Sequence, residues 1–286
     1  MLVGVLGYGL SQRGGKPWTS ETREPTLLLD EFGNMVWATC LHVSVGDNYV
    51  GQANYRATVV RVEGNKAYLK RDAQQARAAV AGTSLALPLG ASSKLICLYS
   101  THTDESYVPT DGSEALPGQG GIIKVASAFA QALSSVGFVV KHDPTAHDPH
   151  DAMAYTRSRR TATALAALKP YAMFDVHRDA APAEAYAAVV RGVEIQQIMI
   201  VVGRQNPFSS ANMFFALRVK QEADRMYPGL IRGIFMASGD YNQDLDPGSL
   251  LLEVGTHMLP REHAERSVSF LARVLASLLG VPGFPS

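Results

Sequence analysis

Two histidines and a glutamate near the ends of apolar runs have the types and spacing of zinc ligands. His102 and Glu105 follow the run 94–100 (KLICLYS), and the two residues between them let an imidazole and a carboxylate reach one ion. His177 follows the run 171–176 (YAMFDV) and is the third expected ligand. A catalytic zinc ion keeps three protein ligands and one open position, where it lowers the pKa of water to about 7. These residues predict metal-dependent hydrolysis.

Glu253 is the candidate acid and base of the same site. It lies in the run 249–255 (SLLLEVG), where leucine and valine neighbours make a solvated surface carboxylate unexpected. A carboxylate beside an activated water can accept its proton and transfer it to the leaving amine. Each residue alone has a plainer explanation, because strand-end histidines usually satisfy other polar groups and a buried glutamate can belong to a structural ion pair. Only the combination predicts a metal site.

Further polar residues could assist the site or serve only local structure. His142 and His147 could orient the substrate or the ligands, or could cap their loop. Asp175 and Asp179 flank His177, and either carboxylate could orient its ring. The sequence leaves open which of the two does so.

A second group of candidates lies farther from the ligands in the sequence. Glu114 is a reserve carboxylate ligand, and His257 could stabilise an oxyanion. The polar loop 241–244 (YNQD) could line the cleft. Arg157 and Arg159 could bind a substrate carboxylate through the guanidinium fork, or could form the solvated start of a helix.

Alternating strand and helix patterns are expected to position these residues from 94 onward. Continuous apolar runs are typical of strands buried on both faces, and stretches with helical spacing separate them. The expected strands are 94–100, 138–143, 171–177, 195–203 and 249–255, and the expected helices are 120–136, 160–168, 209–226 and 260–279. This alternation predicts an α/β fold with a mostly parallel sheet and helices on both faces. Such sheets bind ligands at the carboxyl ends of their strands, so the four candidate residues are expected at one edge.

The N-terminal part of the chain has a different pattern. Residues 1–24 are expected to be a flexible leader, because 11–24 are polar and rich in Gly, Ser and charge. Short β-rich runs broken by turn residues predict a small antiparallel β module over 25–72. Residues 73–93 turn rich in Ala, Gly and Ser and are interpreted as a linker, which leaves 94–286 as the catalytic domain.

Composition argues against several classes of protein. The 286 residues are 47% hydrophobic and 18% charged with a formal net charge of +0, so the chain has no global field that would recruit nucleic acid. Cys40 and Cys97 lie in apolar runs without a Cys-x-x-Cys spacing, and we expect two buried thiols. No stretch approaches the roughly 18 apolar residues of a membrane-spanning helix. The apolar run 2–10 is short and lacks a preceding basic residue, which makes it a poor signal peptide.

Several motifs in register resemble the stage II sporulation protein P family over residues 94–279. They are LYSTHTDESYVPT, HDPTAHD, AYTRSR, FDVHRDA, VVGRQNP, YPGLIRGI and YNQDLDPGSLLLEVGTH. The resemblance implies a zinc-dependent N-acetylmuramoyl-L-alanine amidase with an amidase/phosphorylase-like fold. This family removes stem peptides from the glycan strands of peptidoglycan and is also credited with endopeptidase cleavage of cross-links. The resemblance further implies a lytic transglycosylase as partner during engulfment in spore-forming bacteria.

The resemblance carries over to individual residues. His102, Glu105 and His177 match the metal positions of the family, and Glu253 matches its catalytic glutamate. Family members often have His-Thr-His where this chain has Ser-Thr-His at 100–102, so the earlier histidine is absent and is not expected to be an essential ligand. Members are typically exported or membrane-anchored, which implies an extracytoplasmic location, although no anchor is visible in this sequence.

Three hypotheses about function follow. The first is a zinc amidase that cleaves peptidoglycan between N-acetylmuramic acid and L-alanine. The second is a zinc carboxypeptidase-like peptidase or deacylase, in which Arg157, Arg159 or Arg178 would hold a free carboxylate. The third is a wall-binding or scaffold protein without activity. Product analysis separates the first two hypotheses, and metal analysis tests the third.

Overall fold

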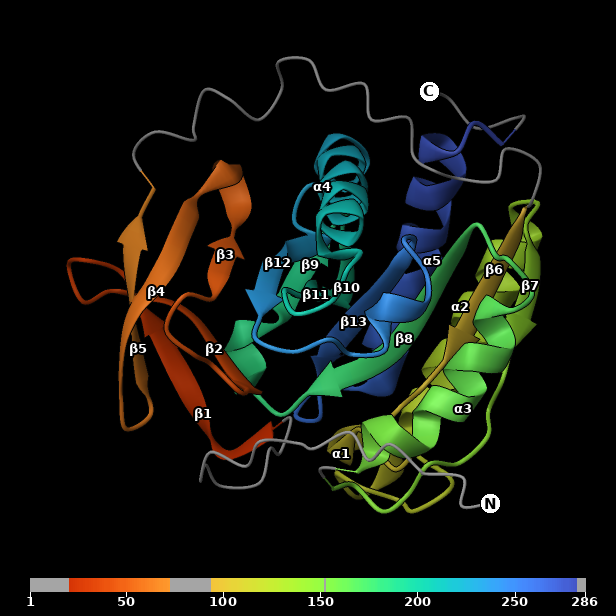
Figure 1. Cartoon of the computed structure of the whole chain (residues 1–286), viewed down its shortest axis with the longest axis horizontal. Coiled ribbons are helices and arrows are strands. Elements are labelled where there is room, and N and C mark those ends of the chain that lie inside the picture. The colour runs from red at the N-terminus through yellow and green to blue at the C-terminus, as the bar shows by residue number, and fades with distance from the viewer. Residues whose placement is uncertain (1–20, 73–93, 152, 282–286) are drawn as a thin grey trace, which may run out of the picture.

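A mixed β-sheet of eleven strands dominates the part of the chain that the structure, a computed structural model, describes (Figure 1). That part comprises residues 21–72, 94–151 and 153–281. Across the sheet the strands are β2 (Met35–Leu41), β1 (Glu21–Leu29), β5 (Lys66–Arg71), β4 (Arg56–Glu63), β3 (Asn48–Val50), β12 (Ile231–Ala237), β11 (Ile198–Gly203), β13 (Ser249–Thr256), β8 (Ala172–Asp179), β6 (Leu95–Tyr99) and β7 (Val139–His142). A separate hairpin consists of β9 (Ala187–Val190) and β10 (Val193–Gln196).

The helices of the described residues connect these strands. The α-helices are α1 (Val108–Asp111), α2 (Gly121–Ser135), α3 (Ala154–Ala166), α4 (Ser209–Met226) and α5 (Arg261–Leu278). Three short 3-10 helices are η1 (Gln52–Asn54), η2 (Ala183–Ala185) and η3 (Gln243–Leu245). Among these helices none has the length and apolar character required to cross a bilayer.

Strand directions in the right half of Figure 1 confirm the predicted α/β class. Strands β7, β6, β8 and β13 run parallel to one another. Strand β11 is antiparallel to β13 and parallel to β12, so this half of the sheet is mostly parallel. Every residue of β8 and of β13 is buried, as expected for strands covered on both faces.

Strand β12 was not predicted from the sequence. It contains Gly233, and glycine weakens a strand pattern because it has no side chain to pack. In the structure a Cβ atom at this position would clash with the carbonyl oxygen of Val50. The glycine therefore allows β3 to pair closely with β12.

Helices α2, α4 and α5 cover one face of the sheet. Their apolar residues share one core with the inward residues of β6, β8, β11 and β13. On α2 the buried residues follow helical spacing: Ile122, Val125, Ala126, Phe129 and Leu133. This periodicity is the reason that the segment forms a helix against the sheet and not a further strand.

The opposite face of the sheet carries α3 and the N-terminal strands. Leu165 of α3 packs with Cys97 and Met173. Farther along the same face, Trp37 and Leu69 of the N-terminal strands share a core with residues of β11, β12 and β13. The predicted helices on both faces are thus present, with strands completing the second layer.

The N-terminal strands continue the main sheet, because β3 is antiparallel to β12. Their mutual pairs are antiparallel except for β1 and β5, which run parallel. Strand β1 starts at Glu21, four residues before the expected start of the module. The expected linker, 73–93, and residues 1–20 of the expected leader lie outside the described residues. Both cysteines are buried free thiols, as predicted.

Candidate metal centre

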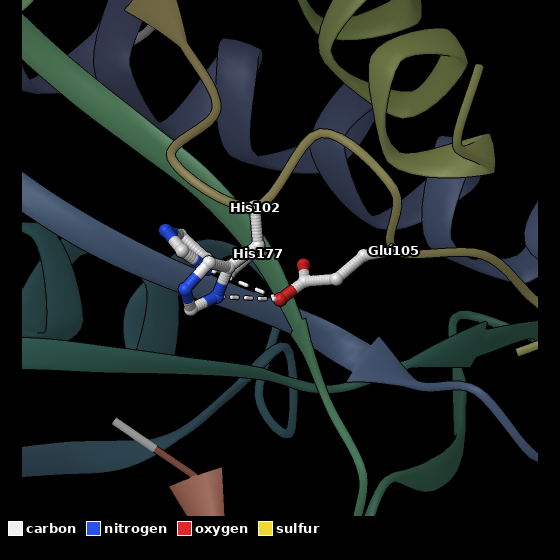
Figure 2. A group of neighbouring side chains, drawn as sticks. All are labelled: His102, Glu105 and His177. Carbon is white, nitrogen blue, oxygen red and sulfur yellow. Dashed lines mark hydrogen bonds and ion pairs between the residues drawn. The ribbon is translucent and has the colours of Figure 1, made fainter. Parts of the chain in front are cut away.

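The structure brings together the side chains of His102, Glu105 and His177 (Figure 2). His102 and Glu105 lie in the loop that follows β6, and His177 lies on β8. The Nδ1 atoms of the two imidazoles lie 3.2 and 3.3 Å from the same carboxylate oxygen, Oε1 of Glu105. One ligand atom from each residue lies within 4.8 Å of the others. Two imidazoles and one carboxylate at this separation could hold a divalent metal ion.

Glu105 is held in place by backbone groups around it. Its second oxygen, Oε2, accepts a hydrogen bond from the backbone N–H of Arg178 at 2.8 Å. The carbonyl of Glu105 accepts the N–H of Ile122 at the start of α2. A Cβ atom on Gly120 would clash with the carbonyl oxygens of Thr103 and Glu105, so glycine is needed for this close approach. Hydrogen bonds therefore join the loop after β6 to β8 and to the start of α2.

Asp175 is the carboxylate that faces the ring of His177. Its Oδ1 lies 2.9 Å from Nε2 of the imidazole. Asp175 also accepts hydrogen bonds from the backbone N–H and the hydroxyl of Thr101, at 2.8 and 2.6 Å. A carboxylate behind a histidine ligand fixes the ring and increases its basicity. Of the two flanking aspartates, Asp175 is thus the one close enough to His177 to act as the orienting partner.

Charge in this cluster is balanced between the imidazoles and the carboxylates. Burial alone would lower the pKa of His177, but the carboxylates of Asp175 and Glu105 outweigh it and hold that pKa well above its usual value. Burial would raise the pKa of Glu105, but His177, His102 and Arg178 together hold it well below its usual value. The carboxylate of Glu105 is therefore ionised and attracts a cation.

Glu253 lies beside His177 on the same face of the sheet. The two residues are partners in the parallel register of β13 and β8. Side chains of register partners on neighbouring parallel strands project to the same side, with strands about 4.8 Å apart. Glu253 is only 2% exposed. The structure thus places this carboxylate next to the histidine–glutamate cluster.

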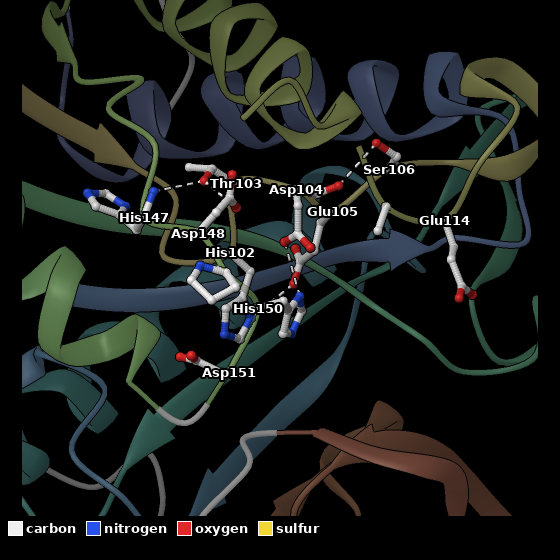
Figure 3. Close-up of polar contacts among 12 residues, drawn as sticks. His102, Thr103, Asp104, Glu105, Ser106, Glu114, His147, Asp148, His150 and Asp151 are labelled. Carbon is white, nitrogen blue, oxygen red and sulfur yellow. Dashed lines mark hydrogen bonds and ion pairs between the residues drawn. The ribbon is translucent and has the colours of Figure 1, made fainter. Parts of the chain in front are cut away.

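His150 belongs to the cluster but was missed in the sequence. Its ring stacks on that of His102 with centroids 3.7 Å apart, and its Nδ1 lies 3.1 Å from Oδ1 of Asp104 (Figure 3). Arg157 fixes the loop that carries His150, because its guanidinium donates to the carbonyl of His147 and to Asp151. The only sequence signal was one more histidine in the same loop, two residues beyond the motif HDPTAHD.

The ring of Tyr155 packs against both histidines, and the sequence did not predict this contact. Its ring lies edge-on to His102 at 5.6 Å and parallel to His177 at 6.3 Å between centroids. Tyr241 packs edge-on against Tyr155 at 5.5 Å. Burial raises the pKa of the Tyr155 phenol well above its ordinary value, so the hydroxyl remains a neutral donor. Its motif AYTRSR was noted in the sequence without a role for this residue.

The remaining histidine and glutamate candidates lie outside the metal-binding group. His147 contacts the carbonyl of Ser100 and the hydroxyl of Thr161, each at 2.8 Å. His142 lies 3.5 Å from Ser127 at the end of β7. Figure 3 shows Glu114 apart from Glu105. The carboxylate of Glu114 lies 3.9 Å from Nε2 of His257.

The three candidate arginines have internal partners. Arg159 forms a two-pronged ion pair with Asp244, with N–O distances of 2.9 and 2.5 Å, and also donates to Asn242. Arg178 donates to the carbonyls of Ser106 and Glu114. Arg157 donates to its own loop. Each guanidinium therefore already has carbonyl or carboxylate partners within the chain.

The fold and the site define a class of protein: an α/β protein whose sheet carries a buried histidine–glutamate cluster suited to a divalent metal. The chain belongs to the stage II sporulation protein P (SpoIIP) family, whose family model matches residues 48–276. This match confirms the resemblance found in the motifs. Strands β1 and β2 lie before the matched residues.

Individual relatives were also found. The chain is 29% identical over 204 residues to stage II sporulation protein P of Bacillus subtilis (strain 168), covering 65% of this chain and 51% of that protein. It thus spans about half the length of this curated relative. An N-acetylmuramoyl-L-alanine amidase from Clostridium difficile 630 has a TM-score of 0.43 and 13% identity, covering 67% of this chain and 99% of that chain. The CwlD amidase from Clostridioides difficile, in complex with the GerS lipoprotein, has a TM-score of 0.45 and 11% identity, covering 66% and 100%.

Proposed function

We propose that this chain is a zinc-dependent amidase of peptidoglycan that hydrolyses the amide between N-acetylmuramic acid and L-alanine. One observation carries the proposal: the buried cluster of His102, Glu105 and His177 lies beside the buried carboxylate of Glu253, in a member of the SpoIIP family. A bound zinc ion would supply Lewis-acid activation of the scissile carbonyl and of a water molecule.

The side chains of this chain divide the remaining work. Glu253 accepts a proton from the attacking water, whose oxygen bonds to the lactyl carbonyl carbon. When the carbon–nitrogen bond breaks, Glu253 returns that proton to the nitrogen of L-alanine, which leaves as an amine. Asp175 keeps the ring of His177 in one orientation throughout. The products are a glycan strand with a free lactyl carboxylate and an intact stem peptide.

The carboxypeptidase-like alternative lacks support among the arginines. Such an enzyme needs a guanidinium that is free to bind the terminal carboxylate of a peptide. Arg157, Arg159 and Arg178 instead bind carbonyl and carboxylate groups of the chain itself. The same site could also act on cross-links as an endopeptidase, and the products distinguish these reactions.

Membership in the SpoIIP family supports a role of the proposed activity in sporulation. We infer that the chain acts outside the cytoplasm on cell-wall peptidoglycan during engulfment, with a lytic transglycosylase as partner. A transglycosylase cuts the glycan strand, whereas an amidase removes its peptides. The two reactions together would dismantle the wall more completely than either alone.

Mass spectrometry of muropeptides tests the proposed function. Purified sacculi are incubated with the zinc-loaded chain and, as a control, with its Glu253→Gln variant. The wild type should release whole stem peptides and leave peptide-free glycan, and the variant should retain zinc but lose activity by about four orders of magnitude, as removal of catalytic machinery does. Release of single amino acids would establish a carboxypeptidase instead. Sacculus binding without zinc and without products would favour a scaffold.

A further inference from the structure

Tyr155 is placed to contact a substrate that occupies the metal centre. It lies on the first turn of α3, and its half-buried ring packs against the imidazoles of both His102 and His177. The charges of Asp175 and Glu253 are near enough to raise the pKa of its phenol further. The ring therefore borders the metal ligands and the proposed acid/base residue together.

The hydroxyl of Tyr155 differs from those of two other buried tyrosines nearby. Tyr107 donates to the carbonyl of Val254, and Tyr186 donates to Asp179. Within residues 21–72, 94–151 and 153–281, no group hydrogen-bonds the hydroxyl of Tyr155. This hydroxyl is also absent from the fully buried polar atoms of the described residues, so a ligand can reach it. A tyrosine pairs an apolar ring with a polar O–H, and a reachable donor beside a catalytic cluster indicates a ligand as its partner.

The loop after β12 fixes the position of Tyr155. Asn242 donates to the backbone carbonyl of Tyr155 at 3.2 Å, and the Arg159–Asp244 ion pair joins the same loop to α3. Tyr241 and Asn242 both have left-handed backbone conformations, with φ of 54° and 56°. Such strained conformations persist where the surroundings enforce them, and they gather at functional sites. The loop therefore holds the first turn of α3 in place through these contacts.

We propose that Tyr155 is a catalytic residue whose phenolic O–H donates a hydrogen bond to the carbonyl oxygen of the scissile amide. This inference rests on the proposed amidase function and adds a residue to it. When water adds to the carbonyl carbon, the carbonyl electron pair moves onto that oxygen, and the hydrogen bond strengthens as negative charge develops. Tyr155 keeps its proton throughout, so no proton transfer beyond that of Glu253 is needed. A donor fixed in place before the reaction stabilises this charge without reorganisation.

Removal of one oxygen atom, in Tyr155→Phe, tests the proposal. Because no described group bonds the hydroxyl, the variant should fold and bind zinc as the wild type does. Its kcat for release of stem peptide should fall on the order of 10²-fold, as for loss of one oxyanion donor, with little change in KM. Tyr227→Phe is the matched control, because it removes the same atom from a buried tyrosine whose ring packs on Phe270 of α5. The control variant should keep the wild-type kcat.

A binding measurement supplies a readout that does not depend on turnover. In the Glu253→Gln background, calorimetry measures the affinity for a phosphinate analogue of the muramoyl–alanine amide and for N-acetylmuramoyl-dipeptide. Adding Tyr155→Phe should weaken the tetrahedral phosphinate selectively, because the donor binds the developing oxyanion more strongly than the ground-state carbonyl.

The outcomes separate the two proposals. Equal kcat and equal phosphinate affinity in Tyr155→Phe and its parent would reduce Tyr155 to a packing residue, while stem-peptide release by the wild type would leave the amidase function intact. If the zinc-loaded wild type releases no stem peptide, the amidase function and the role of Tyr155 in it are both overturned. An equal loss in Tyr227→Phe would assign the effect to a general cost of losing a tyrosine hydroxyl and would overturn the role of Tyr155.

Discussion

Two aspartates of β8 have different roles because they contact different neighbours. Every second residue of a strand projects to the same side of the sheet. In β8 three such residues are Asp175, His177 and Asp179. Asp175 contacts the imidazole of His177, whereas Asp179 binds Thr39, Cys40 and Tyr186. One aspartate thus serves the metal centre and the other serves the contact with the N-terminal strands.

Asp175→Asn should weaken zinc binding while the three ligands remain. The amide cannot hold the ring of His177 as a carboxylate does, and the imidazole becomes less basic. We expect zinc affinity to fall about 10- to 100-fold, measured by competition with a chelator. Asp143→Asn, which alters a carboxylate that caps the N–H of Thr145, is the control and should leave affinity unchanged. Unaltered zinc affinity in Asp175→Asn would remove Asp175 from the site.

One short connection between elements contributes to stability in a way that depends on pH. The turn that leads into β13 contains Asp246, whose Oδ1 accepts the N–H of Gly248 at 2.8 Å. Burial raises the pKa of this carboxyl to about 6. A folded-state pKa above the unfolded value means that the folded chain binds the proton more tightly. The stability that Asp246 contributes is therefore fully present below pH about 4 and is lost as pH rises to about 6.

Asp246→Asn should accordingly stabilise the chain at neutral pH. An asparagine carbonyl can still accept the N–H of Gly248, but it carries no charge to desolvate. The melting temperature of the variant should exceed that of the wild type at pH 7.5, and the gain should shrink at pH 5.0. A gain of equal size at both values of pH would show that ionisation of Asp246 is not its cause. Thermal unfolding followed by circular dichroism measures both.

A contact between two strands that are far apart in the sheet order joins the N-terminal strands to the rest of the described residues. Strand β2 is one edge of the sheet and β8 lies near the other, yet Thr39 and Cys40 of β2 both donate to Asp179 of β8. The sheet must curl to bring them together, and the shared core of Trp37, Phe235 and Leu251 fills the space inside the curl. The N-terminal strands therefore support the strand that carries His177.

Thr39→Val should reveal the strength of that support. The valine removes the 2.7 Å hydrogen bond to Asp179 and leaves a buried carboxylate oxygen with one partner fewer. We expect the free energy of unfolding in urea to fall by about 1–3 kcal/mol. Thr58→Val, at a half-buried hydroxyl of the same strand layer, is the control and should cost less. An unchanged midpoint for Thr39→Val would mean that the N-terminal strands are not coupled to β8.

Sequence alone determined the class of fold and the residues that converge. The ends of apolar strands carry His102, Glu105, His177 and Glu253, and parallel strands of one sheet end at a common edge. Their convergence follows from the hydrophobic pattern, which is a local property of the chain, and from the parallel sheet that this pattern predicts. For the same reason most predicted strands and helices of the C-terminal part match observed elements, although the predicted strand 195–203 divides into the end of β10 and β11. Strand β9 was not predicted, and β12 was not predicted because Gly233 interrupts its pattern.

Tertiary structure decided everything that depends on where a side chain points. Thr39 and Asp179 are separated by 140 residues, and no sequence pattern relates them. His150 and Tyr155 reach the cluster from a segment that Arg157 and Asn242 bind through its backbone carbonyls. Asp175 contacts His177, whereas Asp179 binds Thr39 and Cys40 of the N-terminal strands. Such choices arise from packing between distant segments, which the order of residues does not display.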